Sequence, residues 1–329
     1  LSTISRRRST TSSASLEITY LDENGKDRGG LTAEFINGIK DEIISRGRII
    51  RWDSESGLYH LRRDPQDVSK DEAPEESENL NELKLFGYIV GLSIYHKVPL
   101  NIQFSPIIYQ IICGLSPNRD IDMMAVLRET DSTFYKSLRR MGDVSELDLA
   151  EYSFPKFKGD QIRSWKSERG ELKDKSQILK YIPLAARAHV YTPYENSLNQ
   201  FKAGLDSAIS SDLIKKHITP DEVKTILMGQ NDFKAEDWRA ACLAPTHSAE
   251  FDEQYEWFWR AVDDITAEQR GKLLKYVFAL VSLPYGGFSA LNPDPSVIFI
   301  VEKEKKISYP AHQLASIKLS YIPFLVMKI

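Results

Sequence analysis

Two cysteines and six histidines are the residues of this chain best suited to nucleophilic or metal chemistry. Cys242 and His247 lie five positions apart, shortly after Asp237, and a thiolate beside an imidazole is a pairing used in covalent catalysis. The sequence nevertheless favours a packed or surface loop for this stretch. Cys113 stands within an apolar run and is expected to pack in the core, where a cysteine behaves as a small hydrophobic residue.

The remaining histidines show no metal-binding spacing. His60, His96, His189 and His217 are scattered along the chain, and two cysteines are too few for a disulfide framework or a four-cysteine zinc site. We therefore expect no metal and no cofactor. The low cysteine count favours a reducing compartment, which we take to be the cytoplasm, with the nucleus left open as a second location.

Composition sets the broad class of the protein. The chain has 329 residues, of which 42% are hydrophobic, so it can bury a sizeable core and is long enough for two domains. A formal net charge of -4 provides no overall basic field, which argues against nonspecific binding of nucleic acid. No segment approaches the ~20 consecutive apolar residues that a membrane-spanning helix needs, so membrane insertion is not expected.

The first 15 residues are rich in serine and threonine and include Arg6-Arg7-Arg8 without an apolar core. This composition excludes a secretory signal and predicts a disordered basic linker over residues 1–15. Residues 16–21 then alternate as a half-buried strand does, and the turn-forming residues 22–25 follow, which predicts a hairpin at the start of the domain. A glycine pair at 29–30 precedes a helix with an apolar stripe over residues 35–43.

The next segments alternate between clear patterns and a polar break. A second hairpin is predicted from residues 49–52 and 58–61, and an acidic surface loop from residues 64–79. Residues 82–95 predict a buried helix in which Gly87 and Gly91 share one face and allow a neighbouring element to approach closely. Apolar residues at helical spacing predict further helices over residues 107–114, 123–140, 175–191, 196–207 and 220–227.

The short polar stretch Gly229-Gln230-Asn231-Asp232 lies between two strongly patterned regions. Such a stretch is typical of a hinge between packed units, so we place the domain boundary there.

Collinear motifs along residues 16 to about 320 resemble the HECT-type ubiquitin-protein ligase domain. The amino-terminal part carries Asp27-Arg28-Gly29-Gly30-Leu31, Leu85-Phe86-Gly87-Tyr88 and Thr219-Pro220-Asp221-Glu222. The last hundred residues carry Asp237-Trp238, Trp257-Phe258-Trp259, Leu283-Pro284-Tyr285-Gly286-Gly287-Phe288 and Tyr309-Pro310-Ala311-His312. Each motif alone is weak, but their order and intervals together are specific.

The resemblance implies an α+β, bilobal fold and a role in ubiquitin transfer. It implies a larger, mostly helical amino-terminal lobe, residues 16–229, that docks a ubiquitin-conjugating enzyme, and a smaller α/β carboxy-terminal lobe, residues 230–329, that is incomplete here. In this family a cysteine of the small lobe takes ubiquitin as a thioester and passes it to a lysine of a protein substrate. The implied partners are therefore the conjugating enzyme, ubiquitin and a protein substrate.

The acceptor cysteine that this family uses is missing from the matching position. Counting from His312 puts Leu314 there, and a one-residue insertion would put Ala315 there; neither side chain can attack a thioester. Two interpretations stay open, namely a truncated or wrongly joined carboxy terminus and a pseudoenzyme. The alternative to a ligase is a noncatalytic module that binds a conjugating enzyme or ubiquitin.

Overall fold

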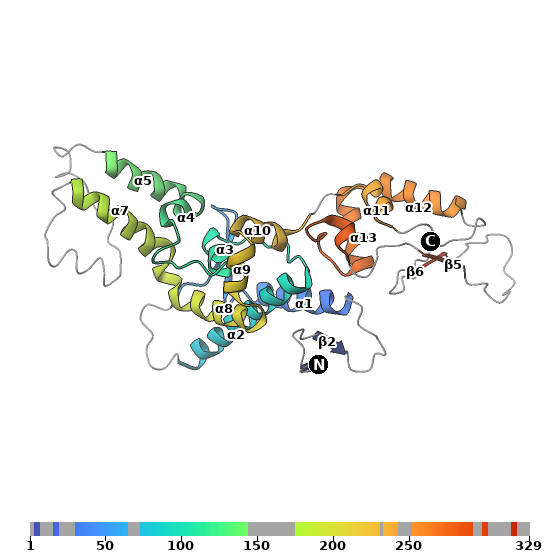
Figure 1. Ribbon diagram of the computed structural model, residues 1–329, viewed down its shortest axis with the longest axis horizontal. Coiled ribbons are helices and arrows are strands. Elements are labelled where there is room, and N and C mark those ends of the chain that lie inside the picture. Colours follow the sequence, from blue (N-terminus) through green and yellow to red (C-terminus); the bar gives the residue numbers. More distant parts are fainter. Residues whose placement is uncertain are drawn as a thin grey trace. The chain divides into compact units, whose positions relative to one another are not determined.

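The computed structural model of this chain describes residues 3–6, 16–19, 30–64, 73–143, 175–230, 233–242, 252–291, 298–301 and 317–320. Helices dominate these residues, and their strands form two-stranded antiparallel sheets (Figure 1). The predicted mostly helical content is confirmed. The chain divides into a central unit, Lys40–Tyr95 with Ile102–Lys224, and a terminal unit, Leu1–Ile39 with His96–Asn101 and Thr225–Ile329. The predicted lobe boundary at Gly229 stays a prediction.

The central unit is built from one hairpin and a set of helices. Its elements are β3 (Ile50–Asp53), β4 (Leu58–Leu61), α2 (Ala73–His96), α3 (Pro106–Ile112), α4 (Met123–Thr130), α5 (Ser132–Asp143), α7 (Lys175–Val190), η3 (Thr192–Tyr194), α8 (Glu195–Ala208) and α9 (Ser211–His217). Helices α1 (Gly30–Arg46) and α10 (Pro220–Met228) contribute residues to both units.

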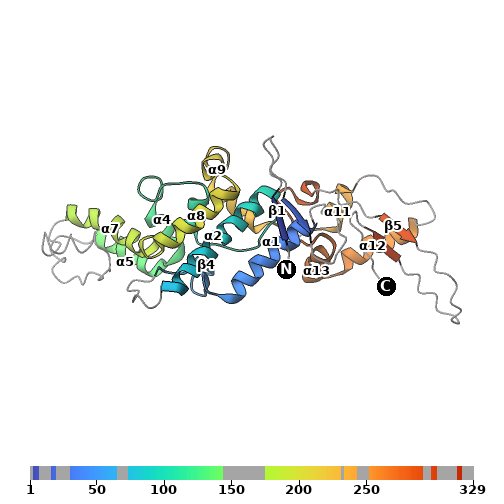
Figure 2. The ribbon, with the colours of Figure 1, turned by 90° about the horizontal axis from the view of Figure 1, so that it is seen from below.

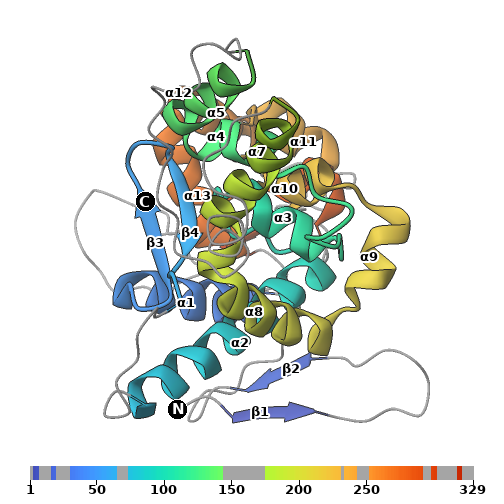
Figure 3. The same ribbon diagram turned by 90° about the vertical axis from the view of Figure 1, so that its left-hand side faces the viewer.

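Helices α2 and α8 pack with their backbones in close contact (Figure 3). A β-carbon added to Gly87 would lie 2.8 Å from the carbonyl carbon of Phe201, and one added to Gly91 would lie 2.7 Å from the β-carbon of Ala208. Beside this contact the ring of Phe86 packs on that of Phe201, with centroids 5.9 Å apart. The close approach predicted from the glycine spacing is thus confirmed, and the neighbour is α8.

The hairpin predicted from residues 49–52 and 58–61 is confirmed as β3 and β4. Trp52 lies opposite Tyr59, and their rings meet edge to face with centroids 4.9 Å apart. The segment just before α3 extends this hairpin. The Tyr59 N–H donates to the Gln103 carbonyl (2.8 Å), and the Ser105 N–H donates to the Tyr59 carbonyl (2.9 Å). These bonds join the hairpin to the start of α3.

The helical stretch predicted over residues 123–140 is broken in the structure into α4 and α5, which lie near α7 (Figures 1 and 2). The break occurs at Asp131, whose φ of -148° is not helical. Its N–H donates to Leu127 (2.8 Å), and its carboxylate accepts the N–H of Phe134 (2.8 Å). Aspartate stabilises a helix start in this way, so one residue ends α4 and begins α5.

The acidic loop predicted over residues 64–79 is partly wrong. Helix α2 begins at Ala73, so residues 73–79 are helical, while residues 65–72 lie outside the described residues. A proline second in the helix followed by two glutamates is a favourable start, because proline fits the first turn and acidic residues complement the helix dipole. The charge that indicated a loop therefore also favours a helix amino terminus.

The terminal unit holds the short strands β1 (Thr3–Arg6) and β2 (Leu16–Thr19), which pair with each other, and the helices near the carboxy terminus. The strand predicted from residue 16 thus pairs with a segment of the predicted linker that precedes it. The other elements are α11 (Ala235–Ala241), α12 (Asp252–Asp264), α13 (Ala267–Phe278), η5 (Gly287–Ala290), β5 (Ile298–Val301) and β6 (Ile317–Ser320).

Aromatic rings form the core of this helical part. Trp238, 1% exposed, stacks on Phe288 with centroids 5.2 Å apart and an interplanar angle of 6°, and it meets Trp259 edge to face at 5.5 Å. Thr266 caps the start of helix α13: its hydroxyl accepts the N–H of Gln269, and the Gln269 side chain accepts the N–H of Thr266. Helices α12 and α13 lie on either side of this cap.

Candidate functional site

Gly229 ends α10 in a conformation that favours glycine. Its φ is +66°, and its N–H donates to the Thr225 carbonyl (2.9 Å). A β-carbon at this position would lie 2.5 Å from the Leu283 carbonyl oxygen and 2.5 Å from the Ser282 hydroxyl. Both the backbone conformation and the lack of space therefore require glycine.

The residues around Gly229 are tied to a second segment of the same unit. Gln230 and Leu283 form an antiparallel bridge, in which the Gln230 N–H donates to Leu283 (2.8 Å) and the Leu283 N–H donates to Gln230 (2.9 Å). The Ser282 hydroxyl donates to the Met228 carbonyl (2.9 Å). If the chain moves at Gly229, these hydrogen bonds must either break or move together with the segment that contains Leu283. A hinge at Gly229 and Gln230 stays a prediction, and Asn231 and Asp232 lie outside the described residues.

The bridge leads directly into the turn before η5. Gly286 and Gly287 both have positive φ, +97° and +65°, and the Gly287 N–H donates to the Pro284 carbonyl (2.9 Å). This turn brings Phe288 against Phe233, with ring centroids 5.0 Å apart. The two glycines thus form a turn that, within the described residues, places an aromatic ring in the core.

The two cysteines lie in different surroundings. Cys113 is buried, its thiol lies 3.7 Å from the Ile218 carbonyl, and burial raises its pKa to about 11. A thiol with so high a pKa is protonated at neutral pH and is a poor nucleophile. Cys242 is half-buried at the end of α11, and neither cysteine forms a disulfide. His247, its predicted neighbour, lies outside the described residues, so this pairing stays untested.

The predicted acceptor position lies outside the described residues. Leu314, Ala315 and His312 follow β5 in the chain and precede β6, which begins at Ile317. Strands β5 and β6 pair in antiparallel register, with Ile300 opposite Lys318.

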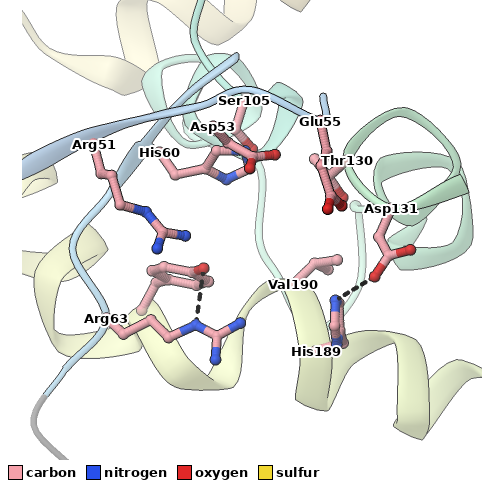
Figure 4. Close-up of a pocket in the computed structure, with 11 residues that line it drawn as sticks. Arg51, Asp53, Glu55, His60, Arg63, Ser105, Thr130, Asp131, His189 and Val190 are labelled. Atoms are coloured by element: carbon pink, nitrogen blue, oxygen red, sulfur yellow. Dashed lines mark hydrogen bonds and ion pairs between the residues drawn. The ribbon is translucent and has the colours of Figure 1, made fainter. Parts of the chain in front are cut away.

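The structure brings together two histidines that the sequence keeps far apart. His60 of β4 and His189 of α7 line one pocket of about 170 Å³ in the central unit (Figure 4). Within the described residues, no three His, Cys, Asp or Glu side chains gather as a metal site would require. Sequence spacing offered no signal for this pocket, because its walls come from separate elements.

A sequence model of the family described as HECT-domain (ubiquitin-transferase) matches residues 48–313, well over half of the chain. The chain belongs to the HECT domain family. E3 ubiquitin-protein ligase hecw-1 of Caenorhabditis elegans is 24% identical over 293 residues, which make up 88% of this chain and 22% of that protein. E3 ubiquitin-protein ligase RSP5 of Chaetomium thermophilum is 26% identical over 88% of this chain and 34% of its own length. Human E3 ubiquitin-protein ligase NEDD4 is 27% identical over 84% of this chain and 20% of its own length.

The HECT domain match ends at residue 313, immediately before Leu314. The chain spans about a third or less of the length of these three relatives. Among the described residues, no helix combines the length and the apolar character needed to cross a membrane.

Proposed function

We propose that this HECT domain is a bilobal ubiquitin-protein transferase domain. In this proposal the lobe of residues 16–229 docks a ubiquitin-conjugating enzyme, and the lobe of residues 230–329 receives ubiquitin. The family match over residues 48–313 carries the proposal. The mostly helical fold and the aromatic core around Trp238 support it, because a small lobe that moves as a unit needs a core of its own.

The thioester step is where this chain departs from its family. A thioester relay requires a thiolate, which is both a good nucleophile and a good leaving group. The family position holds Leu314, or Ala315 with one insertion, and neither offers an attacking atom. We therefore expect no ubiquitin thioester at this position in the sequence as it stands.

Cys242 is the other thiol to consider, since Cys113 is buried and protonated. Cys242 follows the last turn of α11, where the partial negative charge of the helix carboxy terminus disfavours a thiolate. We propose that Cys242 is not an acceptor.

A noncatalytic module is the alternative. The relatives named above are all described as ubiquitin-protein ligases, which does not favour this alternative. The proposed partners are a conjugating enzyme, ubiquitin and a protein substrate, without a cofactor. We propose a reducing compartment, the cytoplasm or the nucleus, because the chain has two cysteines and they form no disulfide.

The proposal is tested by binding. The folded chain is immobilised and exposed to a panel of ubiquitin-conjugating enzymes, each alone and each loaded with ubiquitin through a stable isopeptide link. Saturable binding of at least one enzyme, strengthened by the loaded ubiquitin, is the expected result. If no enzyme of the panel binds the folded chain in either form, the proposed function is wrong.

A further inference from the structure

The pocket of the central unit shown in Figure 4 has walls from four parts of the fold. The β3–β4 hairpin and the residues just after it supply Arg51, Glu55 and Arg63, the α4–α5 junction supplies Asp131, and α7 with η3 supplies His189 and Tyr194. We call it the two-arginine pocket. It lies within one unit, so a ligand in it would join the hairpin to helices α4, α5 and α7.

The two arginines give the pocket its unused hydrogen-bond donors. Arg63 donates from Nε to the Tyr194 hydroxyl (3.2 Å), and its guanidinium lies 5.8 Å from the centre of that ring. This contact orients the side chain and leaves the two terminal nitrogens of Arg63 without a partner among the described residues. Arg51 has no hydrogen bond or ion pair with the described residues, and both guanidinium groups reach into the pocket from the same side (Figure 4).

Three carboxylates also line the pocket, and two of them already have donors. Asp53 accepts from the N–H and the hydroxyl of Ser56, at 3.1 and 2.5 Å. Asp131 accepts the Phe134 N–H (2.8 Å) and pairs with the His189 ring at 3.2 Å. Glu55 is exposed, and its carboxylate has no partner among the described residues.

On the wall formed by Arg51 and Arg63, the pocket therefore has more unpaired hydrogen-bond donors than unpaired acceptors. A ligand bound at this wall has to bring acceptor oxygens, and the two guanidinium groups favour negative charge close to them, although three carboxylates line the same pocket. A phosphate monoester offers three terminal oxygens and a charge of roughly -1.5 to -2 near pH 7. Guanidinium forks match phosphate oxygens in pairs, and such charge-assisted bonds are stronger than those between neutral groups. A carboxylate offers the two guanidinium groups fewer oxygens than a phosphate monoester does.

We propose that the two-arginine pocket binds a phosphate monoester, held between the guanidinium groups of Arg51 and Arg63. The group comes either from a small phosphorylated metabolite or from a phosphorylated serine of a protein. This inference does not depend on ubiquitin transfer.

The test measures binding of inorganic phosphate and of a short phosphoserine peptide to the full chain by calorimetry. Arg51→Gln and Arg63→Gln are each expected to weaken binding by roughly tenfold, as expected for the loss of charge-assisted hydrogen bonds. Arg62→Gln is the matched control, because Arg62 is exposed beside Arg63 in the chain but does not line the pocket. It should leave the affinity unchanged. Unfolding curves equal to those of the unchanged chain show that each variant is folded.

Glu55→Gln tests the charge of the ligand. Removing this carboxylate should tighten binding of inorganic phosphate, because it removes a negative charge from the pocket; weaker binding would mean that the anion does not lie in this pocket and would overturn the proposal. Tighter binding of the peptide than of inorganic phosphate identifies a phosphorylated side chain as the source, and equal binding identifies a small phosphate. The proposal is wrong if neither probe binds at millimolar concentration, or if the Arg51 and Arg63 variants bind as well as the Arg62 control.

Discussion

Gly204 in α8 lies against Lys84 in α2, backbone to backbone. A β-carbon added to Gly204 would lie 2.7 Å from the carbonyl carbon of Lys84 and 3.0 Å from its α-carbon. Gly87 makes the reciprocal contact from α2 toward α8. The distance between these two helices is therefore set by residues that lack a side chain, which also lets two buried rings, Phe86 and Phe201, come into contact.

Gly204→Ala should destabilise the domain strongly. The added carbon meets backbone atoms, which cannot move aside as a flexible side chain does, so α2 and α8 must separate. Overpacking of this kind costs ~1–3 kcal/mol or more of unfolding free energy. Urea unfolding followed by circular dichroism measures the loss.

Gly38→Ala is the control for helix propensity. Gly38 lies in α1, and a β-carbon there would meet nothing within 4 Å. Alanine is the better helix former by up to ~1 kcal/mol, so this variant should be slightly more stable. Equal effects of the two substitutions would show that the α2–α8 contact is not as close as described.

Gly229→Ala is expected to loosen the segment that follows α10. The substitution adds a residue disfavoured at positive φ and places its carbon against the Leu283 carbonyl. Gly47→Ala separates these two effects, because Gly47 has φ +60° but nothing within 4 Å of an added carbon. Hydrogen exchange at the amides of Gln230 and Leu283 should become faster in the Gly229 variant alone. Unchanged exchange would contradict the described bridge.

Much of this fold could be predicted from the sequence, because it depends on local patterns. The β3–β4 hairpin follows from alternation around a polar turn, and Gly87 with Gly91 predicts a close approach by a neighbouring element, which the structure identifies as α8. The break at Asp131 could not be predicted from periodicity. It depends on one side chain that accepts the Phe134 N–H, while the apolar spacing continues through it.

The candidate site likewise has one part that the sequence predicts and one part that it does not. The family acceptor position is reached by counting along the chain from His312, to Leu314 or, with one insertion, to Ala315, and it stays a prediction. The two-arginine pocket could not be predicted, because Arg63 and Tyr194 become neighbours only when η3 packs beside the hairpin. Charge patterns along the chain do not show which side chains lack partners in the fold.

Alkylation should distinguish the two cysteines. Iodoacetamide reacts with the thiolate, and burial raises the pKa of Cys113 to about 11, so Cys113 should stay unmodified in the folded chain. Cys242 is half-buried and should react first. Mass spectrometry of the native and urea-unfolded chain is the measurement. Modification of Cys113 at the rate seen after unfolding would contradict its place in the core.

Acid should destabilise the central unit through its two pocket histidines. Burial lowers the pKa of both His60 and His189 below 6.5, only partly opposed by Asp53 and Asp131 respectively. The unfolded chain therefore takes up protons before the folded chain does, so the stability present above about pH 6.5 falls as pH drops through that value toward the folded pKa. Urea midpoints compared at neutral pH and at about pH 5.5 should show this loss.

His60→Asn combined with His189→Asn provides the control. This variant should lose part of the difference between the two pH values, because asparagine does not titrate. A difference as large as that of the unchanged chain would assign the pH dependence to other groups.

Single-turnover ubiquitin transfer shows whether this HECT domain keeps the family scaffold without a thiol at the family acceptor position. A conjugating enzyme that binds the chain is loaded with fluorescent ubiquitin and mixed with the unchanged chain, with Leu314→Cys, with Ala315→Cys and with Cys242→Ser. We predict no reducible ubiquitin adduct on the unchanged chain and an adduct on one of the two cysteine-gain variants. An adduct on the unchanged chain that disappears in Cys242→Ser would contradict this account.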